Sequence, residues 1–324
     1  MSKLIKDCVY RFIEIPVLCS SFMDTSIFQR LRRIKQLGLS HYVYPSAVHT
    51  RFEHSLGVMH LSGEVIERLR KYKKISQREK ILVQLAGMLH DVGHLAFSHL
   101  FDLILERISV ISPSLKSHEN RSLFFVREMN SELNLLTEKE ENMVCSMIKG
   151  DIYESDRAFL YEIVCNARNG LDVDKMDYIQ RDAYHTGLPG FQPDYIIRNL
   201  VLTKDNHIAV KKKAKQDVDD LYLTRKRMFT NVYYHKVNLK IEKIYVCLIG
   251  KEKFLQELQK MPITDWDDYA VEILLRQLFP AEMEVIDKRK LEHSCNECEN
   301  FSMVRTPKLN GHISGDGQIT YLDL

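Results

Sequence analysis

A short run of histidine and aspartate follows an almost wholly apolar segment of the sequence. The run is His90-Asp91-Val92-Gly93-His94, and an adjacent histidine and aspartate can bind one metal ion where a helix ends and the backbone turns. Burying such a pair is costly unless something uses it. His54 and Asp174 are the candidates for two further ligands. Two histidines and two carboxylates suit Fe, Mn, Zn or Co, together with Mg²⁺, and such a metal lowers the pKa of bound water and polarises a phosphoryl oxygen.

Taken singly, these features are weak, because His-Asp dipeptides occur by chance and a lone histidine is more often a core residue. Their combination is more specific. Eight of the 13 histidines lie between His41 and His118. In the segment that contains Asp174, the residues Asp174, Tyr178 and Asp182 share one helical face at spacings of four. The joint pattern therefore predicts a metal site built from three distant segments.

Helical patterns surround these residues and must position them. The segment from Gln77 to His90 has a charged first turn and then an apolar stretch, which predicts a buried helix that ends at the His90 run. Apolar spacing predicts further helices over residues 26–37, 54–71, 119–130, 138–150, 175–185 and 217–246. A strand signal at residues 207–210 predicts one side of a hairpin. We therefore expect a mainly α protein with a small β-hairpin, a core over residues 1–250 and a short C-terminal α-rich lobe over residues 251–324.

The composition is that of an ordinary globular protein. Of 324 residues, 45% are hydrophobic and 28% charged, and a net charge of +2 gives no bulk attraction to nucleic acid or acidic membranes. The sequence shows neither a signal-peptide pattern nor 18 consecutive apolar residues, so we expect an intracellular protein, cytoplasmic or nuclear, without a membrane segment. Seven scattered cysteines fit a reducing compartment. His293, Cys295 and Cys298 are a candidate zinc group, for which a solvated loop is the favoured alternative.

The sequence resembles the HD-domain metal phosphohydrolases, and among them the deoxynucleoside triphosphate (dNTP) triphosphohydrolases that also carry a SAM domain. The resemblance runs from about residue 3 to residue 246, and its most specific segments are FQRLRRIKQLG (28–38), TRFEHSLGV (50–58), LAGMLHDVGHLAFSHLFD (85–102), NARNGLDVDKMDYIQRDAYHTG (166–187) and YYHKV (233–237). It implies an HD-domain helical bundle without the SAM domain and with a shortened C-terminal lobe. It also implies a metal-dependent, dGTPase-like enzyme that hydrolyses a dNTP to the deoxynucleoside and inorganic triphosphate.

The resemblance assigns a role to each residue of the site. The implied metal ligands are the four already selected by residue type, His54, His90, Asp91 and Asp174. The implied proton-transfer residues, with His99 as the acid and His118–Asp102 as a supporting dyad, are His94, His99, His118 and Asp102. The residues implied to bind the triphosphate are Arg51, Lys175, Tyr178 and Arg225. Those implied to surround the sugar and base are Gln36, Leu37, Asp182 and Tyr233, of which Tyr233 would exclude a 2′-hydroxyl. On residue type alone, His118 would be a surface residue, and Lys175 and Arg225 would belong to solvated helix faces.

A second nucleotide site is also implied, because the family is activated by GTP or dGTP bound between subunits. The residues that match the guanine-reading set are Asp24, Gln29 and Arg32, and those that match the activator's phosphate ligands are Lys3, Lys211 and Lys213. We therefore expect a homo-oligomer, a dimer or tetramer. A charged hairpin tip is the simpler interpretation of the lysines at 211–215. Where the family has Asp-Pro-Ile-His-Gly, this chain has Asp7-Cys8-Val9-Tyr10-Arg11, and the family's histidine and glutamine near Tyr233 are Phe229 and Tyr234.

Two other functions are open at this point. The first is an HD phosphohydrolase that acts on nucleoside monophosphates or cyclic nucleotides, which the implied sugar-binding set disfavours. The second is a nucleic-acid-binding regulatory module with a vestigial site, which the interleaved basic and aromatic residues from Tyr222 to Lys240 support and an intact ligand set disfavours.

Overall fold

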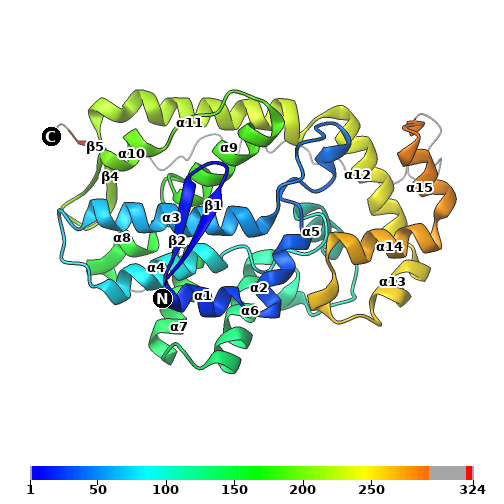
Figure 1. The fold of residues 1–324 in the computed structure, drawn as a ribbon, viewed down its shortest axis with the longest axis horizontal. Coiled ribbons are helices and arrows are strands. Elements are labelled where there is room, and N and C mark those ends of the chain that lie inside the picture. Colours follow the sequence, from blue (N-terminus) through cyan, green and yellow to red (C-terminus); the bar gives the residue numbers. More distant parts are fainter. Residues whose placement is uncertain (1, 153, 292–318, 323–324) are drawn as a thin grey trace.

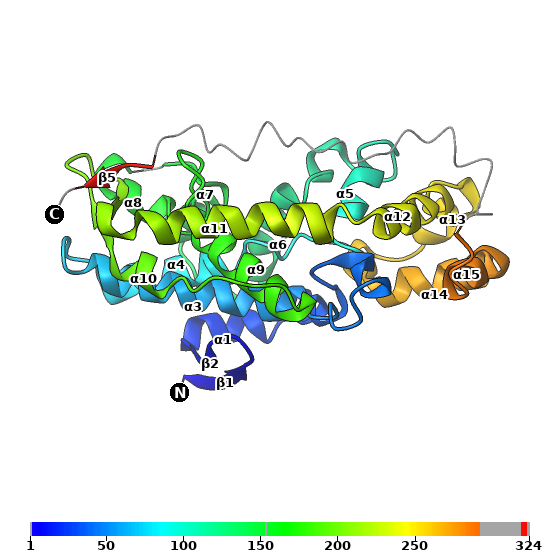
Figure 2. The same ribbon diagram turned by 90° about the horizontal axis from the view of Figure 1, so that it is seen from above.

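The computed structural model describes residues 2–152, 154–291 and 319–322, and helices make up most of it (Figure 1). The prediction of a mainly α fold is therefore confirmed. Two small sheets accompany the helices: an antiparallel hairpin at the N-terminus and a second sheet with strand order β3-β4-β5. Seen from above, the N-terminal hairpin projects from one side of the helical body (Figure 2).

The first half of the chain supplies the hairpin and the helices around the His90 run. Its elements are β1 (Lys3–Asp7), β2 (Arg11–Ile15), α1 (Val17–Met23), α2 (Ser26–Gln29), α3 (Arg51–Leu69), α4 (Gln77–Leu89), α5 (His99–Leu105), α6 (His118–Leu133) and α7 (Glu138–Lys149). Thr50 and Glu53 form a capping box that starts α3, and Ser76 and Glu79 form another that starts α4. These caps fix where each helix begins, and so which way its first side chains face.

The second half adds the Asp174 helix, the second sheet and the C-terminal helices. Its elements are α8 (Ala158–Tyr161), α9 (Val173–Thr186), α10 (Asp194–Arg198), β3 (Leu200–Leu202), β4 (Ile208–Lys211), α11 (Lys215–Met228), α12 (Lys236–Ile249), α13 (Glu252–Leu258), α14 (Asp268–Leu278), α15 (Pro280–Asp287) and β5 (Tyr321–Leu322). The strand expected at 207–210 is β4, which confirms that prediction. It pairs antiparallel with β3 and parallel with β5. After it the lysines continue through a 3₁₀ turn into α11, so they do not form a hairpin tip.

Two of the predicted helices are interrupted, and each interruption has a physical cause. The helix expected over 26–37 ends after α2 and a 3₁₀ turn, because Ile34 is extended (φ −118°, ψ 110°). The backbone of 34–36 pairs instead with 49–51: Gln36 N donates to His49 O (2.9 Å) and Arg51 N to Ile34 O (2.9 Å). The helix expected over 217–246 divides into α11 and α12 at a π-helical turn, Phe229–Tyr233. Such turns often mark functional positions.

The N-terminal hairpin is an element that the sequence patterns did not reveal. In register, Lys3 faces Ile15 and Asp7 faces Arg11. Only Ile13 and Ile15 are fully buried in it, while most of its side chains are exposed. Strands this short, with so few buried positions, carry little periodic signal.

The C-terminal helices share an apolar cluster with earlier parts of the chain. This cluster packs Phe254, Trp266 and Leu275 together with Phe101 of α5 and Tyr245 of α12. Backbone contacts join the same regions, since Ala96 N donates to Trp266 O at 2.8 Å. The Asp268 carboxylate accepts bonds from Phe97 N (2.7 Å) and Lys35 N (3.0 Å). The division into a core and a lobe at residue 250 stays a prediction. None of the described helices has the length and apolar character needed to cross a membrane.

Candidate metal and nucleotide site

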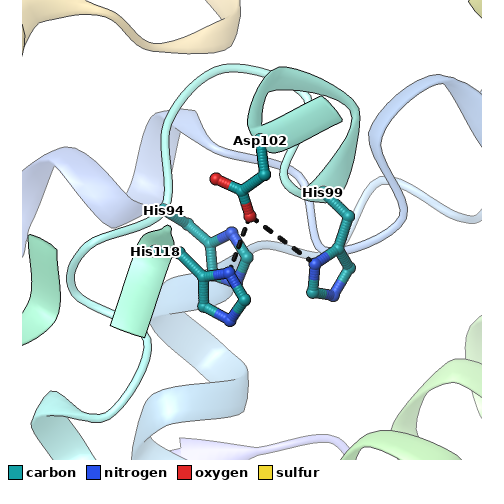
Figure 3. Close-up of side chains that lie close together, drawn as sticks. All are labelled: His94, His99, Asp102 and His118. Carbon is teal, nitrogen blue, oxygen red and sulfur yellow. Dashed lines mark hydrogen bonds and ion pairs between the residues drawn. The ribbon is translucent and has the colours of Figure 1, made fainter. Parts of the chain in front are cut away.

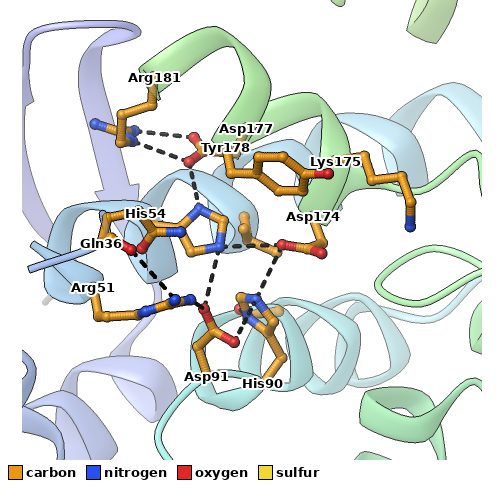
Figure 4. Close-up of polar contacts among 12 residues, drawn as sticks. Gln36, Arg51, His54, His90, Asp91, Asp174, Lys175, Asp177, Tyr178 and Arg181 are labelled. Atoms are coloured by element: carbon orange, nitrogen blue, oxygen red, sulfur yellow. Dashed lines mark hydrogen bonds and ion pairs between the residues drawn. The ribbon is translucent and has the colours of Figure 1, made fainter. Parts of the chain in front are cut away.

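The four predicted metal ligands meet where the end of α4 faces α3 and α9 (Figure 4). His54 Nε2 lies 3.1 Å from Asp174 Oδ1 and 3.4 Å from Asp91 Oδ2. His90 Nε2 lies 3.3 Å from Asp174 Oδ1 and 3.5 Å from Asp91 Oδ1. Distances of this size between donor atoms are those of ligands around one ion with bonds of about 2.0–2.2 Å.

The two imidazoles are oriented so that their Nε2 atoms are free to act as ligands. His54 Nδ1 bonds to Asp177 Oδ2 at 2.7 Å, and His90 Nδ1 bonds to the carbonyl oxygen of Gly87 at 2.8 Å. Both acceptors require a proton on Nδ1, which leaves the Nε2 lone pair for a metal. Both Nε2 atoms are buried without a hydrogen-bond partner. The residues therefore fit a divalent cation, which would supply Lewis-acid polarisation and an acidic bound water.

Charge within the cluster keeps it ready for a cation. Burial alone would raise the pKa of Asp91, but the Arg51 guanidinium and the neighbouring histidines hold it well below its usual range. Burial would likewise lower the pKa of His54, but Asp174 and Asp177 raise it to about 10. In the metal-free protein His54 therefore carries a proton at neutral pH, in the place that a cation would take.

Behind His54 lies an ion-pair chain in which Asp177 and Arg181 are fully buried. The Arg181 guanidinium binds both oxygens of Asp177, each at 3.0 Å, and also Asp7 Oδ2 at 2.9 Å. Gly57 makes room for it: a Cβ there would lie 1.8 Å from Asp177 Oδ1. Sequence reasoning missed Asp177, Arg181 and Gly57. The only signal was the Asp-Arg spacing of four in α9, which is ordinary for a solvent-exposed helix pair.

Arg51 lies between the cluster and the loop that precedes α5. Its Nη1 donates to Asp91 Oδ2, and its Nε donates to Ser98 Oγ at 2.9 Å. Ser98 in turn donates to Lys35 O at 2.7 Å. Phe97 and Ser98 both have φ of 57°, in the left-handed region that non-glycine residues seldom adopt. This backbone turn places His99 at the first position of α5.

The three histidines predicted to transfer protons, His94, His99 and His118, form a second cluster with Asp102 (Figure 3). His118 Nδ1 bonds to Asp102 Oδ2 at 2.6 Å, and His99 Nδ1 lies 3.9 Å from the same oxygen. The His94 and His118 rings stack with centroids 4.0 Å apart. His94 Nε2 lies 3.4 Å from Asp91 Oδ1, so the two clusters adjoin.

Asp102 is held in place from behind by Arg121, a residue that sequence reasoning missed. Arg121 Nη2 donates to Asp102 Oδ1, and its Nε donates to Gly93 O at 2.7 Å. Burial raises the pKa of Asp102, but the hydrogen bond from His118 and the nearby His99 hold it well below its usual range. A Cβ on Gly93 would lie 2.1 Å from His118 O, so only glycine allows α6 to approach this closely.

A cavity of about 480 Å³ opens beside both clusters. Its wall includes Asp91 and Asp174 of the first cluster and His99 and His118 of the second. It also includes all eight residues predicted to bind substrate: Gln36, Leu37, Arg51, Lys175, Tyr178, Asp182, Arg225 and Tyr233. The volume is ordinary for a pocket that takes a molecule of nucleotide size.

One side of the cavity carries positive charge on positioned side chains. Lys175 Nζ lies 2.8 Å from Asp172 Oδ2, the carboxylate that also caps α9. Burial lowers the pKa of Lys175, but Asp172 raises it above its usual range, so the ammonium stays charged. Arg225 Nε donates to the Tyr178 hydroxyl at 3.1 Å.

A second group of lining residues is built around Asp182. Its Oδ2 accepts a bond from the Tyr233 hydroxyl at 2.6 Å, and its Oδ1 lies 2.8 Å from His49 Nε2. His49 is buried, and no role had been assigned to it from the sequence. The π-helical turn places Tyr233 here, and Phe229 packs edge-on against its ring at 4.9 Å.

The six residues predicted for an activator fall into two groups. Lys3 Nζ binds Asp24 Oδ2 at 2.6 Å, and Arg32 Nε donates to Gln29 Oε1 at 2.8 Å. These four lie on β1, α1–α2 and the turn after it, whereas Lys211 ends β4 and Lys213 follows it. Figure 1 shows that β4 and α1–α2 lie apart. The structure does not bring the two groups together within one chain. The candidate zinc residues His293, Cys295 and Cys298 fall outside the described residues.

Comparison with known proteins agrees with this geometry. The HD domain family matches residues 51–182. The deoxynucleoside triphosphate triphosphohydrolase SAMHD1 homolog of Dictyostelium discoideum is 35% identical over 246 residues, covering 74% of this chain and 48% of that protein. SAMHD1 of Homo sapiens, with the same activity in its name, is 35% identical over 265 residues, covering 72% and 42%. The HD domain-containing protein L394 of Acanthamoeba polyphaga mimivirus is 38% identical over 256 residues, covering 72% and 54%. The chain thus spans about half the length of these curated relatives.

Proposed function

Since this chain has an HD domain and is similar over most of its length to dNTP triphosphohydrolases, we propose that it is a metal-dependent dNTP triphosphohydrolase. It would cleave a dNTP into the deoxynucleoside and inorganic triphosphate. The observation that carries the proposal is the cavity itself. The two carboxylates of the histidine–aspartate cluster line it, and so do three cations and a set of polar groups that could bind a sugar.

We propose that His54, His90, Asp91 and Asp174 hold the cation, which is Fe, Mn, Zn or Co, with Mg²⁺ bound by the substrate's phosphates. The cation would polarise the α-phosphoryl group and make bound water acidic. Arg51, Lys175 and Arg225 would then neutralise the triphosphate and fix it for attack, which is most of what phosphoryl transfer requires.

His99 is the proposed proton donor to the leaving 5′-oxygen. Its side chain is exposed to the cavity, whereas His118 is held by Asp102 and His94 is buried against it. The bond from phosphorus to the 5′-oxygen breaks as water adds to phosphorus, and the proton from His99 gives the deoxynucleoside its free hydroxyl.

Gln36 and Asp182, which also line the cavity, are proposed to bind the sugar 3′-hydroxyl. Gln36 Oε1 is buried without a partner, and each oxygen of Asp182 can accept a second bond. The Tyr233 ring, fixed by Asp182 and Phe229, would leave no room for a 2′-hydroxyl.

Regulation belongs to the same proposal. Asp24, Gln29 and Arg32 of one subunit would read a guanine, and the lysines Lys3, Lys211 and Lys213 would bind activator phosphates, with GTP or dGTP completing a dimer or tetramer. The separation of the two groups within one chain supports a site shared between chains. An intracellular location, cytoplasmic or nuclear, fits the scattered cysteines of the sequence, which are typical of a reducing compartment.

The test is a turnover assay on the purified, metal-loaded protein with and without GTP. We expect triphosphate release from dNTPs and no hydrolysis of nucleoside monophosphates or cyclic nucleotides supplied in parallel. The double variant His90→Ala/Asp91→Ala should lose turnover and keep its helical circular dichroism, whereas the exposed control Asp205→Ala should lose neither. Turnover retained by the double variant would contradict the metal mechanism, and release of phosphate from monophosphates alone would favour the other HD phosphohydrolase function.

A further inference from the structure

Away from the catalytic cavity, three side chains of metal-binding type converge where the hairpin turn meets the helical body. They are Cys8, in the turn between β1 and β2, Glu53, in the first turn of α3, and His185, in the last turn of α9. One ligand atom from each lies within 4.8 Å of the other two. Cys8 is exposed, and the other two are partly buried.

The distances fit one thiophilic cation. Cys8 Sγ lies 3.6 Å from His185 Nε2. Zinc bonds of about 2.3 Å to sulfur and 2.0–2.1 Å to nitrogen, at a tetrahedral angle, place these two atoms about 3.5 Å apart. Glu53 Oε2 lies 3.9 Å from the same nitrogen, so its carboxylate would have to move by less than 1 Å, roughly, to complete three protein ligands.

Neighbouring contacts hold each of the three proposed ligands in position. Glu53 uses Oε1 for the capping box with Thr50, at 3.4 Å, and so turns Oε2 outward. The His185 ring stacks on His49 with centroids 4.3 Å apart and planes within 11°, which fixes the direction of its Nε2. The thiol is carried on a turn that the Asp7 carboxylate closes, since Val9 N and Tyr10 N donate to its Oδ1 at 2.8 and 2.9 Å.

We propose that Cys8, Glu53 and His185 form a second cation site, of zinc type with water as the fourth ligand, which clamps the N-terminal hairpin to α3 and α9. This mixture of sulfur, nitrogen and carboxylate oxygen ligands favours binding of zinc over binding of Mg²⁺ or Ca²⁺. The hairpin projects from the body, and most of its side chains are exposed, so a bond at its turn would add a restraint to the packing of Ile13 and Ile15.

The clamp would act on both sides of the catalytic cavity. On one side, Asp7 precedes Cys8 and binds Arg181, which binds Asp177 behind His54. On the other, His185 stacks on His49, which bonds to Asp182. A cation at the hairpin turn would thus steady the groups that orient one proposed metal ligand and one proposed sugar ligand.

Cobalt binding tests the site without relying on activity. The full chain is used with Cys295→Ser and Cys298→Ser as the background, because those thiols could bind cobalt themselves. In this background we expect a thiolate-to-cobalt charge-transfer band, which the sulfur-free histidine–aspartate cluster cannot produce. Cys8→Ser should abolish the band, and Cys165→Ser, at a cysteine outside the group, should leave it intact. Absence of the band from the background, or its survival in Cys8→Ser, would overturn the proposal.

Two further measurements test the carboxylate and the clamp. Glu53→Gln keeps the capping box, which accepts glutamine, but removes the charge; we expect weaker cobalt binding with unchanged helix content, and unchanged affinity would remove Glu53 from the site. Hydrogen exchange of residues 3–15 should slow when Zn²⁺ is added to the background protein and should not respond in Cys8→Ser. Exchange that ignores Zn²⁺ in both would refute the clamp.

Discussion

Replacing Asp177 with asparagine tests whether the residues behind the metal ligands matter as much as the ligands. Asp177 touches neither the cavity nor the proposed substrate. Its Oδ2 accepts from His54 Nδ1 at 2.7 Å and from Arg181 Nε at 3.0 Å, and its Oδ1 accepts from Arg181 Nη2 at 3.0 Å. The amide of asparagine has nearly the same shape but only one acceptor oxygen. Either orientation of that amide therefore puts an NH₂ group against a donor of Arg181.

The expected loss has two parts. If the NH₂ faces His54, it favours the imidazole tautomer with its proton on Nε2, which cannot bind a metal. Loss of such a supporting partner lowers metal affinity by about 10- to 100-fold, or about 1.4–2.7 kcal/mol. Arg181 keeps Asp7 at 2.9 Å as a counter-ion, so unfolding free energy should fall by about 3 kcal/mol, at the low end for a broken buried pair.

The assay compares Asp177→Asn with wild type and with Asp205→Asn. The control makes the same replacement at an exposed aspartate. Metal affinity is measured by competition with a chelator, and unfolding free energy by urea titration. Turnover should fall at limiting metal and recover in part at saturating metal, because the four ligands remain. A folded Asp177→Asn protein whose metal affinity stays within twofold of wild type would refute the argument from tautomer and charge.

Three other outcomes are expected. Metal affinity should rise about tenfold per pH unit between pH 6 and 8. The pKa of His54 is raised to about 10, so His54 is protonated throughout that range and a cation must displace its proton. An affinity independent of pH, after correction for the chelator, would contradict this. Gly57→Ala should lower the free energy of unfolding by about 1–3 kcal/mol, because the new Cβ would clash with Asp177. The control Gly190→Ala should be tolerated, since a Cβ there meets nothing closer than 3.5 Å. Equal thermal stability of the two variants would count against the close approach of α3 and α9. Tyr233→Ala should reduce the preference for dGTP over GTP roughly tenfold or more, and Tyr233→Phe, which keeps the ring, should not; the same dGTP/GTP ratio in all three proteins would exclude a steric role.

Local pattern was enough for several of the helices and for the ligand types. The apolar run of α4 ends at His90, and its cap at Ser76 is visible in the sequence. Asp174 belongs to a helix whose face repeats every four residues. That the four candidate ligands meet is a tertiary fact. Each of them was a weak candidate by itself, and only their combination predicted a metal site.

What local pattern could not show is which neighbours hold these ligands. The Asp177–Arg181 pair has the spacing of a solvated helix pair, and only its packing against Gly57 of α3 buries it. His49 lies in an extended segment, and its bond to Asp182 spans 133 positions. The break after α2 likewise depends on pairing between segments 34–36 and 49–51. Each of these depends on contacts between distant segments, on which helical periodicity carries no information.

The contacts of the C-terminal helices bear on how short this protein could be made. Asp268 holds the backbone of Phe97 and Lys35, and Trp266 holds that of Ala96, immediately before the left-handed turn that aims His99. Removing residues 251–324 would strip these acceptors from the turn and expose the apolar face of α5. A truncated protein would keep every proposed metal ligand and every cavity residue. It would lose the contacts that hold the turn before His99, the proposed acid. Trp266 and Asp268 therefore support the turn that presents the proposed acid.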